Sequence, residues 1–270
     1  MAAPLVLDTD IGTNVDDALA LALAIRHPGI ELRAVTTVSG ATTARAELAE
    51  RLLAIGGSPG VEVTVSTRDA RDVLCGIAPD TTIVTIGPQS NLAAAVQRDP
   101  TLVARVVSLV VTGGAFAPIV TLDGAEVHAS RDTNLVGDPA AAIVSLNAGF
   151  STVYVPCDVT FQVPLRHRHV DALRRGDELC RTLATLVHEW RARSGAPDHV
   201  AAMLHDPLAV ACTVERSFVK IERLPVHVAI EDGVPRTVVD ENLGRDADVV
   251  RSVDAAAFAD WWLQTVLGDG

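Results

Sequence analysis

The acidic segment DTDIGTNVDD at residues 8–17 constrains the fold and the chemistry of this chain more than any other stretch. It ends a short apolar run, which predicts a buried strand, and leads into an Ala- and Leu-rich stretch, which predicts a helix. A buried strand followed by a loop and a helix is typical of open α/β sheets, where ligands bind beyond the carboxyl ends of the strands. The sequence therefore predicts that this acidic loop lies at the ligand-binding edge of such a sheet.

The alternation of short Val-, Ile- and Leu-rich runs with longer helical patterns continues to about residue 165. It predicts an open, mostly parallel, doubly wound α/β sheet with helices on both faces. The composition agrees, because 49% of the residues are hydrophobic but only 3% are aromatic, so small and β-branched side chains must fill the core. We expect strands at residues 5–10, 31–38, 61–66, 82–86, 105–112 and 152–156, and helices at residues 16–26, 42–55 and 140–146 and from about residue 90.

The pattern changes after residue 165, where helices predominate and the expected strands are small. No repeat, low-complexity tract or linker separates this part from the rest, so we expect one domain over residues 1–270. We expect one or two helices at residues 173–193, a short helix at 207–213, strands at 218–221, 226–230 and 237–239, and a final helix at 255–267.

The charge and the cysteines argue against several classes of protein. A net charge of −12 at pH 7 repels nucleic acids and anionic membrane surfaces, so neither is an expected partner. The four cysteines lie far apart and form no CxxC pair, which argues against structural zinc and a disulfide framework. The N-terminus lacks a signal-peptide pattern and no apolar run is long enough to span a bilayer, so we expect a cytoplasmic protein.

The carboxylates of the acidic loop predict a cation site. Carboxylates this close repel one another and raise one another's pKa, and a bound cation removes that repulsion. Oxygen ligands without Cys or His favour calcium or magnesium over zinc. Aspartate is also a common helix N-cap, and one or two of these residues could serve only that purpose. Capping does not account for all of them, which are Asp8, Asp10, Asp16 and Asp17.

Two later segments also offer oxygen ligands. In His205-Asp206-Pro207, Asp206 is first interpreted as an N-cap with proline at the first helical position; alternatively, its carboxylate joins the cation site and His205 faces a substrate. The Ile86-Gly87 turn is either a plain strand-to-helix turn or one whose free backbone carbonyl binds the cation.

A further segment contains Asp132, Asn134 and then Asp138-Pro139, which predicts a helix start. Asn134 either structures its loop or contacts a sugar hydroxyl. Asp132 is either such a contact or a solvated side chain.

Taken in order along the chain, these segments resemble the inosine-uridine type nucleoside hydrolases. The resemblance spans nearly the whole chain, and the ordered set of motifs is more specific than any one of them. It is carried by the DxDxG…DD loop at residues 8–17, by Gly87-Pro88 with Asn91, by Gly113-Gly114, by Asp132 and Asn134 with Asp138-Pro139, and by His205-Asp206-Pro207.

The resemblance implies a nucleoside hydrolase fold and a calcium cofactor. Its ligands would be the carboxylates of Asp10, Asp17 and Asp206 and the backbone oxygen of Ile86. Asp8 would support these ligands from behind. Asp10 would also be the general base that takes a proton from water.

The resemblance further implies hydrolysis of the N-glycosidic bond of a ribonucleoside or related ribosyl compound, giving free base and ribose. Asp16, Asp132 and Asn134 would bind the ribose, and His205 would stand near the leaving base. A homo-oligomer is also implied.

The chain departs from the family pattern at several positions. Ala41 replaces an asparagine that contacts the sugar, Asn14 stands where an acid is frequent, and the segment 66–80 is short and lacks a His-Gly element. These changes leave open a specialised nucleoside- or ribosyl-binding homologue without catalysis. A haloacid-dehalogenase-type phosphatase is a further alternative, because Asp8-Thr9-Asp10 fits its DxDx start, although Gly12 does not fit the next position.

Overall fold

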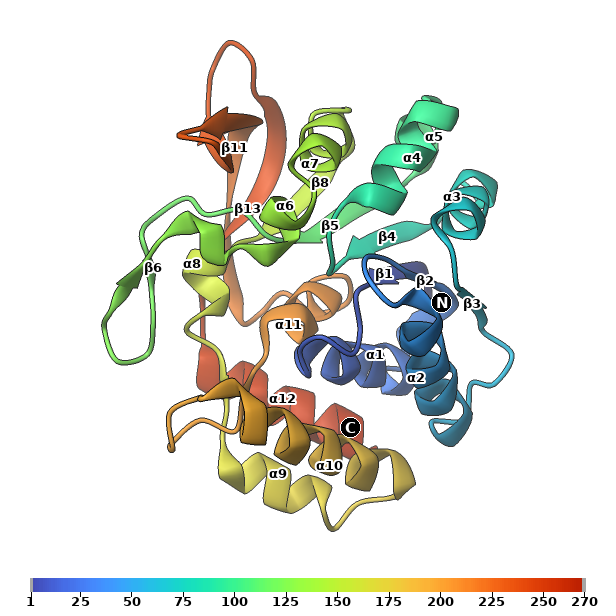
Figure 1. The fold of residues 1–270 in the computed structure, drawn as a ribbon, viewed down its shortest axis with the longest axis vertical. Helices are drawn as coiled ribbons and strands as arrows, with labels where there is room; N and C mark the ends of the chain where they lie inside the picture. Colours follow the sequence, from blue (N-terminus) through green and yellow to red (C-terminus); the bar gives the residue numbers. More distant parts are fainter. Residues whose placement is uncertain (1, 269–270) are drawn as a thin grey trace.

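The computed structural model describes residues 2–268. Figure 1 shows that they form one central sheet with helices on both faces. The described residues contribute nine strands to this sheet, in the order β12-β11-β13-β8-β5-β4-β1-β2-β3. Neighbours from β3 to β13 pair in parallel, and only β11 runs against the others. The predicted mostly parallel α/β class is confirmed.

The strands of the sheet are mostly short and buried. They are β1 (Ala3–Thr9), β2 (Ile30–Thr37), β3 (Glu62–Thr64), β4 (Thr82–Thr85), β5 (Ser108–Thr112), β8 (Thr152–Val155), β11 (Val219–Glu231), β12 (Val234–Val239) and β13 (Arg245–Val253). Two small antiparallel pairs lie outside it, β6 (Ile119–Val120) with β7 (Glu126–Val127), and β9 (Pro164–Leu165) with β10 (Ala202–Met203).

Two layers of helices enclose the sheet because successive strand residues point to opposite faces. In β1, Leu5 and Leu7 pack into one core cluster, whereas Val6 packs into the other. The first layer contains α1 (Asp16–Arg26), α2 (Thr42–Ile55), α9 (His167–Leu173), α10 (Glu178–Ser194), α11 (His205–Ala211) and α12 (Ala255–Leu267). The second contains α3 (Thr67–Gly76), α4 (Ser90–Arg98), α5 (Leu102–Arg105) and α7 (Pro139–Leu146).

Short helices occupy the loops at the carboxyl ends of the central strands. These are η1 (Ala129–Arg131), α6 (Thr133–Gly137) and α8 (Cys157–Thr160). As predicted, Asp138 begins a helix: its side chain accepts a hydrogen bond from Ala141 N, and Pro139 follows in the first turn of α7.

The C-terminal strands differ from the prediction of small, separate ones. Residues 219–221 and 226–230 of two predicted strands belong to a single strand, β11, and β13 was not predicted at all. Pro225 does not break β11, because a proline lacks only the N–H, and its carbonyl still accepts a hydrogen bond from Asp240 N. The alternation in β13 is hidden by charged residues, of which Arg245, Asp246 and Arg251 are exposed.

Other expectations need smaller corrections. Helix α3 fills part of the segment 66–80, where no helix was predicted, and the side chain of Ser66 caps it. The strand expected at 105–112 begins only at Ser108, after α5. No helix within residues 2–268 has the length and apolar character needed to cross a membrane.

Candidate metal and substrate site

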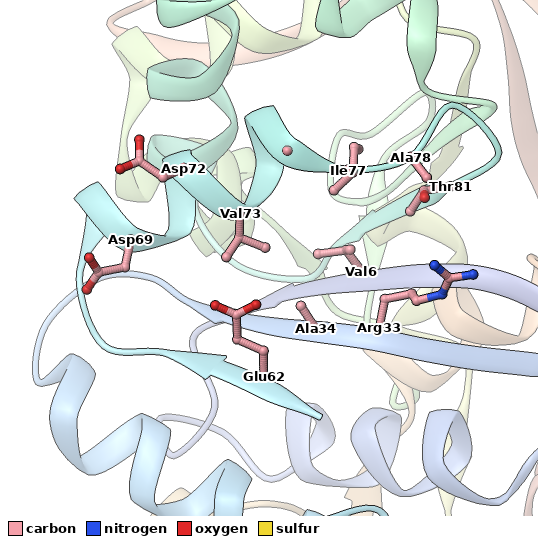
Figure 2. A pocket seen from close by; sticks show the side chains of 11 residues that line it. Val6, Arg33, Ala34, Glu62, Asp69, Asp72, Val73, Ile77, Ala78 and Thr81 are labelled. Carbon is pink, nitrogen blue, oxygen red and sulfur yellow. The ribbon is translucent and has the colours of Figure 1, made fainter. Parts of the chain in front are cut away.

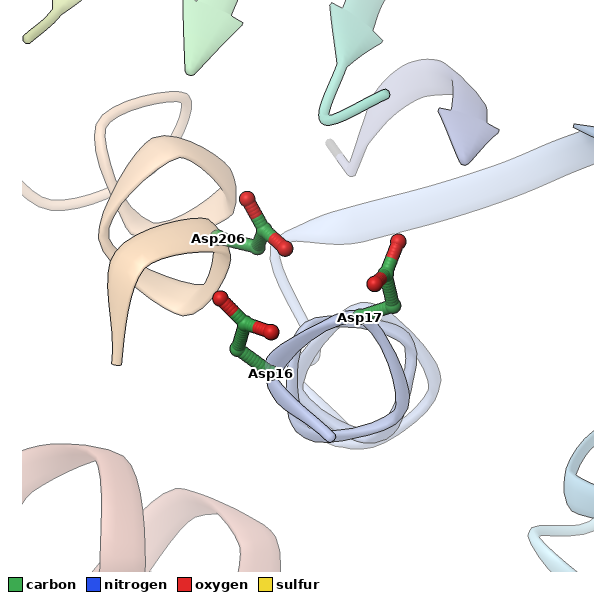
Figure 3. A group of neighbouring side chains, drawn as sticks. All are labelled: Asp16, Asp17 and Asp206. Atoms are coloured by element: carbon green, nitrogen blue, oxygen red, sulfur yellow. The ribbon is translucent and has the colours of Figure 1, made fainter. Parts of the chain in front are cut away.

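Carboxylates from two helices distant in sequence meet at the carboxyl edge of the sheet. Asp16 and Asp17 lie in the first turn of α1, and Asp206 lies in the first turn of α11. One carboxylate oxygen from each lies within 4.8 Å of the others, and all three residues are buried. Figure 3 shows the three side chains directed toward the same space between the two helices.

These aspartates are not helix caps. The N-cap of α1 is Val15 and that of α11 is Leu204, and neither helix has a side-chain capping hydrogen bond. Interpreting Asp206 as an N-cap is therefore wrong. The positive ends of both helices lie beside the carboxylates and partly offset their negative charge.

Burial raises the pKa of each of the three carboxyl groups. The pKa of Asp16 rises to about 7, and those of Asp17 and Asp206 lie well above their usual value. Burial is the largest cause for all three, and repulsion among neighbouring aspartates adds to it. The Thr9 hydroxyl donates a 2.5 Å hydrogen bond to Asp17 Oδ1, which opposes this rise and joins β1 to α1.

Asp10 lies at the rim of this group. Its charge contributes to the raised pKa values of Asp16, Asp17 and Asp206, so it lies close to all three. Burial raises the pKa of Asp10 as well, and the Arg45 guanidinium, 3.9 Å from Asp10 Oδ2, lowers it. The side chain of Asp10 is 19% exposed, whereas Asp16, Asp17 and Asp206 are buried. Asp10 is therefore the most exposed of these four carboxylates.

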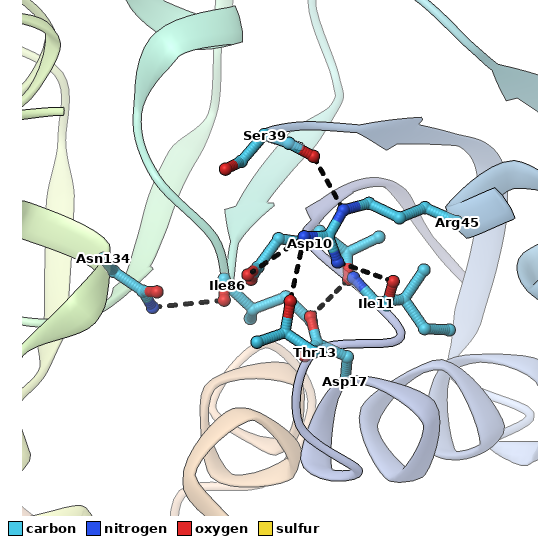
Figure 4. Close-up of polar contacts among 9 residues, drawn as sticks. Asp10, Ile11, Thr13, Asp17, Ser39, Arg45, Ile86 and Asn134 are labelled. Atoms are coloured by element: carbon cyan, nitrogen blue, oxygen red, sulfur yellow. Dashed lines mark hydrogen bonds and ion pairs between the residues drawn. The ribbon is translucent and has the colours of Figure 1, made fainter. Parts of the chain in front are cut away.

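Arg45 of α2 holds the loop that carries Asp10. Its guanidinium donates to the backbone carbonyls of Ser39 and Ile11 and to the Thr13 hydroxyl, at 2.7–2.8 Å. Figure 4 shows these bonds around Asp10. Sequence reasoning missed Arg45, because an arginine inside an amphipathic helix gives no local signal.

Ile86 directly follows β4, and the next residue, Gly87, packs against Asp10. A Cβ atom at Gly87 would lie 2.9 Å from Asp10 N and 3.1 Å from Asp10 Oδ1, so only glycine allows this close approach. The Asn134 side chain donates to the carbonyls of Ile86 and Thr112, at 3.1 and 3.0 Å (Figure 4). Asn134 therefore ties the ends of β4 and β5 together.

Asp8 lies behind the group, within the sheet. Its Oδ1 accepts hydrogen bonds from Thr36 Oγ1 at 2.6 Å and from Asn91 Nδ2 at 2.8 Å. Burial raises its pKa to about 6, against the effect of these two bonds. Its Oδ2 is buried and has no hydrogen-bond partner among the described residues.

Asp132 has a structural role at the edge of the site. It is buried, so interpreting it as a solvated residue is wrong. Its Oδ1 accepts from Leu135 N and caps α6, and its Oδ2 accepts from Gly114 N at 2.6 Å. It also borders a hollow of about 300 Å³, which Phe116 and Thr237 line as well.

His205 precedes Asp206 and contacts the end of α8. Its Nδ1 lies 2.8 Å from Thr160 Oγ1, and its ring packs against that of Phe161 with centroids 4.9 Å apart. Burial lowers the pKa of His205 to about 4, with a smaller contribution from the charge of Arg131. The ring is therefore neutral at pH 7.

The arrangement of these oxygens suits a hard divalent cation. Bonds from calcium to oxygen are about 2.3–2.6 Å long, so two ligands on opposite sides of the ion lie at most roughly 5 Å apart. The 4.8 Å limit among Asp16, Asp17 and Asp206 satisfies this condition. The buried, mutually repelling carboxylates, without a Cys or His in the group, favour calcium or magnesium.

A hollow larger than the one beside Asp132 lies elsewhere. It has a volume of about 660 Å³ and lies between α3 and strands β1 to β3. Figure 2 shows Arg33, Glu62, Asp69 and Asp72 around it, and none of the clustered carboxylates lines it.

This chain is similar to known nucleoside hydrolases in sequence and in fold. The family model for inosine-uridine preferring nucleoside hydrolases matches residues 5–75 and 64–260. A probable uridine nucleosidase 1 from Oryza sativa subsp. japonica is 26% identical over 83% of this chain and 80% of the relative. The pyrimidine-specific ribonucleoside hydrolase RihB from Escherichia coli O157:H7 (strain EC4115) is 24% identical over 96% and 94%.

A solved plant nucleoside hydrolase, PpNRh1, has the same fold, with a TM-score of 0.84, 24% identity and coverage of 99% of both chains. The match to the family model confirms the resemblance predicted from the sequence and the enzyme class of nucleoside hydrolase. Since the model covers most of the sequence, this chain belongs to the inosine-uridine preferring nucleoside hydrolase family.

Proposed function

We propose that this protein uses calcium to hydrolyse the N-glycosidic bond of a ribonucleoside or related ribosyl compound, releasing free base and ribose. The observation that carries the proposal is that carboxylate oxygens of Asp16, Asp17 and Asp206 lie within 4.8 Å of one another, with Asp10 close by. Asp10, Asp17, Asp206 and the Ile86 carbonyl would hold the ion, Asp16 would lie beside it, and Asp8 would support these ligands. A bound calcium ion would lower the pKa of water and so favour its attack.

The chain's own residues would perform the other parts of the reaction. Asp10, the most exposed of the four carboxylates, would accept a proton from the attacking water. Asp16, Asp132 and Asn134 would bind the ribose, and the buried carboxylates would stabilise positive charge that develops on the sugar. As the C1′–N bond breaks, its electron pair moves to the base, which neutral His205 would polarise. The base would take up a proton from solvent as Asp10 releases its own, so that free base and ribose form.

Substrate preference depends on residues around this site. Asp132 already accepts two backbone hydrogen bonds, and Ala41 offers no polar group, so the ribose would have fewer contacts than the family pattern provides. The names of the relatives make uridine and other pyrimidine ribonucleosides the first substrates to test. We also propose that residues 1–270 form a single domain and that the chain forms a homo-oligomer in the cytoplasm. Light scattering of the purified protein tests the oligomeric state.

The test is base release from a panel of ribonucleosides, with free base and ribose both quantified. We expect equal amounts of the two products from at least one nucleoside, with loss of release after calcium chelation. Nucleoside binding without release would instead support the non-catalytic homologue. Release of phosphate from an aryl phosphate would support the phosphatase.

A further inference from the structure

Thr160 makes a contact that the proposed reaction does not yet use. It ends α8, its side chain is fully buried, and its hydroxyl lies 2.8 Å from His205 Nδ1. The next residue, Phe161, packs its ring against the same imidazole. Two successive residues therefore contact one imidazole, Thr160 at its Nδ1 atom and Phe161 through a tilted ring pair.

The direction of this hydrogen bond follows from burial. Within residues 2–268, the Thr160 hydroxyl has no hydrogen-bond partner other than His205 Nδ1. If the ring donated to Thr160, the buried hydroxyl would keep a hydrogen without an acceptor, which is costly. The hydroxyl therefore donates to Nδ1, which leaves the ring hydrogen on Nε2.

The Nε2 edge is free for a ligand. Among the described residues, His205 Nε2 makes no hydrogen bond and is not one of the buried polar atoms that lack a partner. His205 precedes Asp206, whose carboxylate belongs to the acidic group, so this edge is next to the proposed site.

We infer that Thr160 is a positioning residue that fixes His205 in the Nε2–H tautomer and so makes it a hydrogen-bond donor to the leaving base. This inference rests on the proposed function. It names the substrate class as bases that carry a lone pair, on a ring nitrogen or an exocyclic oxygen, beside the scissile bond. Donation to that lone pair stabilises the negative charge that develops as the base departs.

The test compares two leaving groups in three variants. Thr160→Val removes the hydroxyl at nearly constant shape, Thr160→Ser keeps it, and Thr265→Val removes a buried hydroxyl bonded to Trp261 O in α12. A nucleoside that the wild type cleaves is compared with p-nitrophenyl riboside, whose leaving group departs as a stable anion without a hydrogen bond.

We expect Thr160→Val to lower kcat for the nucleoside on the order of 10- to 100-fold with little change in KM, and to leave p-nitrophenyl riboside hydrolysis nearly unchanged. Thr160→Ser and Thr265→Val should behave like the wild type. Equal losses on both substrates, no loss on the nucleoside, or failure of Thr160→Ser to retain activity would each overturn the inference.

A second measurement does not depend on activity. Nitrogen-15 NMR of the histidine rings should show hydrogen on His205 Nε2 in the wild type and a mixture of tautomers in Thr160→Val. Hydrogen on Nδ1 in the wild type would overturn the inference. If neither riboside is cleaved but the Nε2–H tautomer is present, the proposed function fails and the positioning of His205 by Thr160 stands.

Discussion

One carboxylate oxygen of Asp17 lies within 4.8 Å of one carboxylate oxygen of Asp206, although the two residues belong to the first and the eleventh α-helix. Packing of α1 against α11 brings the first turns of both helices together. The acidic group therefore forms only when the sheet and its first helical layer are complete. Cation binding should depend on the native fold.

Replacement of Asp10 by asparagine removes the proposed base while keeping nearly the same shape. We expect kcat for nucleoside hydrolysis to fall on the order of 10²- to 10⁴-fold at saturating calcium. Steady-state kinetics with the exposed Asp123→Asn variant as the control measures this effect. A rate close to that of the wild type would mean that Asp10 does not act as the base.

Replacement of Gly87 by alanine should weaken cation binding without touching a ligand side chain. The new Cβ would clash with Asp10 N and with Val38 Cγ1, at 2.9 and 2.8 Å, and so displace Asp10. We expect calcium affinity to fall on the order of tenfold, as for other changes that misplace ligands. Gly60→Ala is the matched control, because no atom lies within 4 Å of its added Cβ. Isothermal titration calorimetry measures the calcium affinity of both variants. Equal affinities would contradict the expected displacement of Asp10.

Without calcium, the stability of the protein should depend on pH through its buried acids. The folded-state pKa values of Asp8 and Asp16 are raised to about 6 and about 7, from 3.8. As pH rises from about 4 to 7, the unfolded chain loses these protons first, so the two groups lower the free energy of unfolding. Asp16→Asn should remove part of this decrease.

Urea unfolding at several pH values, with chelator and with calcium, measures this dependence. Calcium competes with the protons, so its stabilising effect should grow as pH rises. Identical pH dependence in the wild type and in Asp16→Asn, both with chelator, would show that Asp16 does not titrate in this way.

The sequence predicted the parts of the site that follow from local pattern. Asp8, Asp10, Asp16 and Asp17 lie on one strand-loop-helix segment, and the β-then-α rhythm placed that segment at the carboxyl edge of a parallel sheet. The assignment of Asp206 to the cation site needed the family resemblance, because an Asp-Pro pair at the start of a helix is equally typical of an N-cap.

The contacts that hold these residues were beyond sequence reasoning. Thr36 reaches Asp8 because β1 and β2 pair in the register that sets Asp8 against Thr36, and no local pattern determines that register. Arg45 and Thr160 act across contacts between segments far apart in the chain. The strand β13 was missed because its exposed charges hide the alternation of a half-buried strand.

The central claim is that one calcium ion, held jointly by the acidic loop and by Asp206, enables hydrolysis of the ribosyl bond. The most direct test titrates calcium into chelator-treated wild type and Asp206→Asn, and measures binding by calorimetry and base release in the same samples. We predict one high-affinity ion per wild-type chain, with base release that follows its occupancy, and loss of both in Asp206→Asn. Full base release by the calcium-free wild type, or unchanged calcium affinity in Asp206→Asn, would contradict the claim.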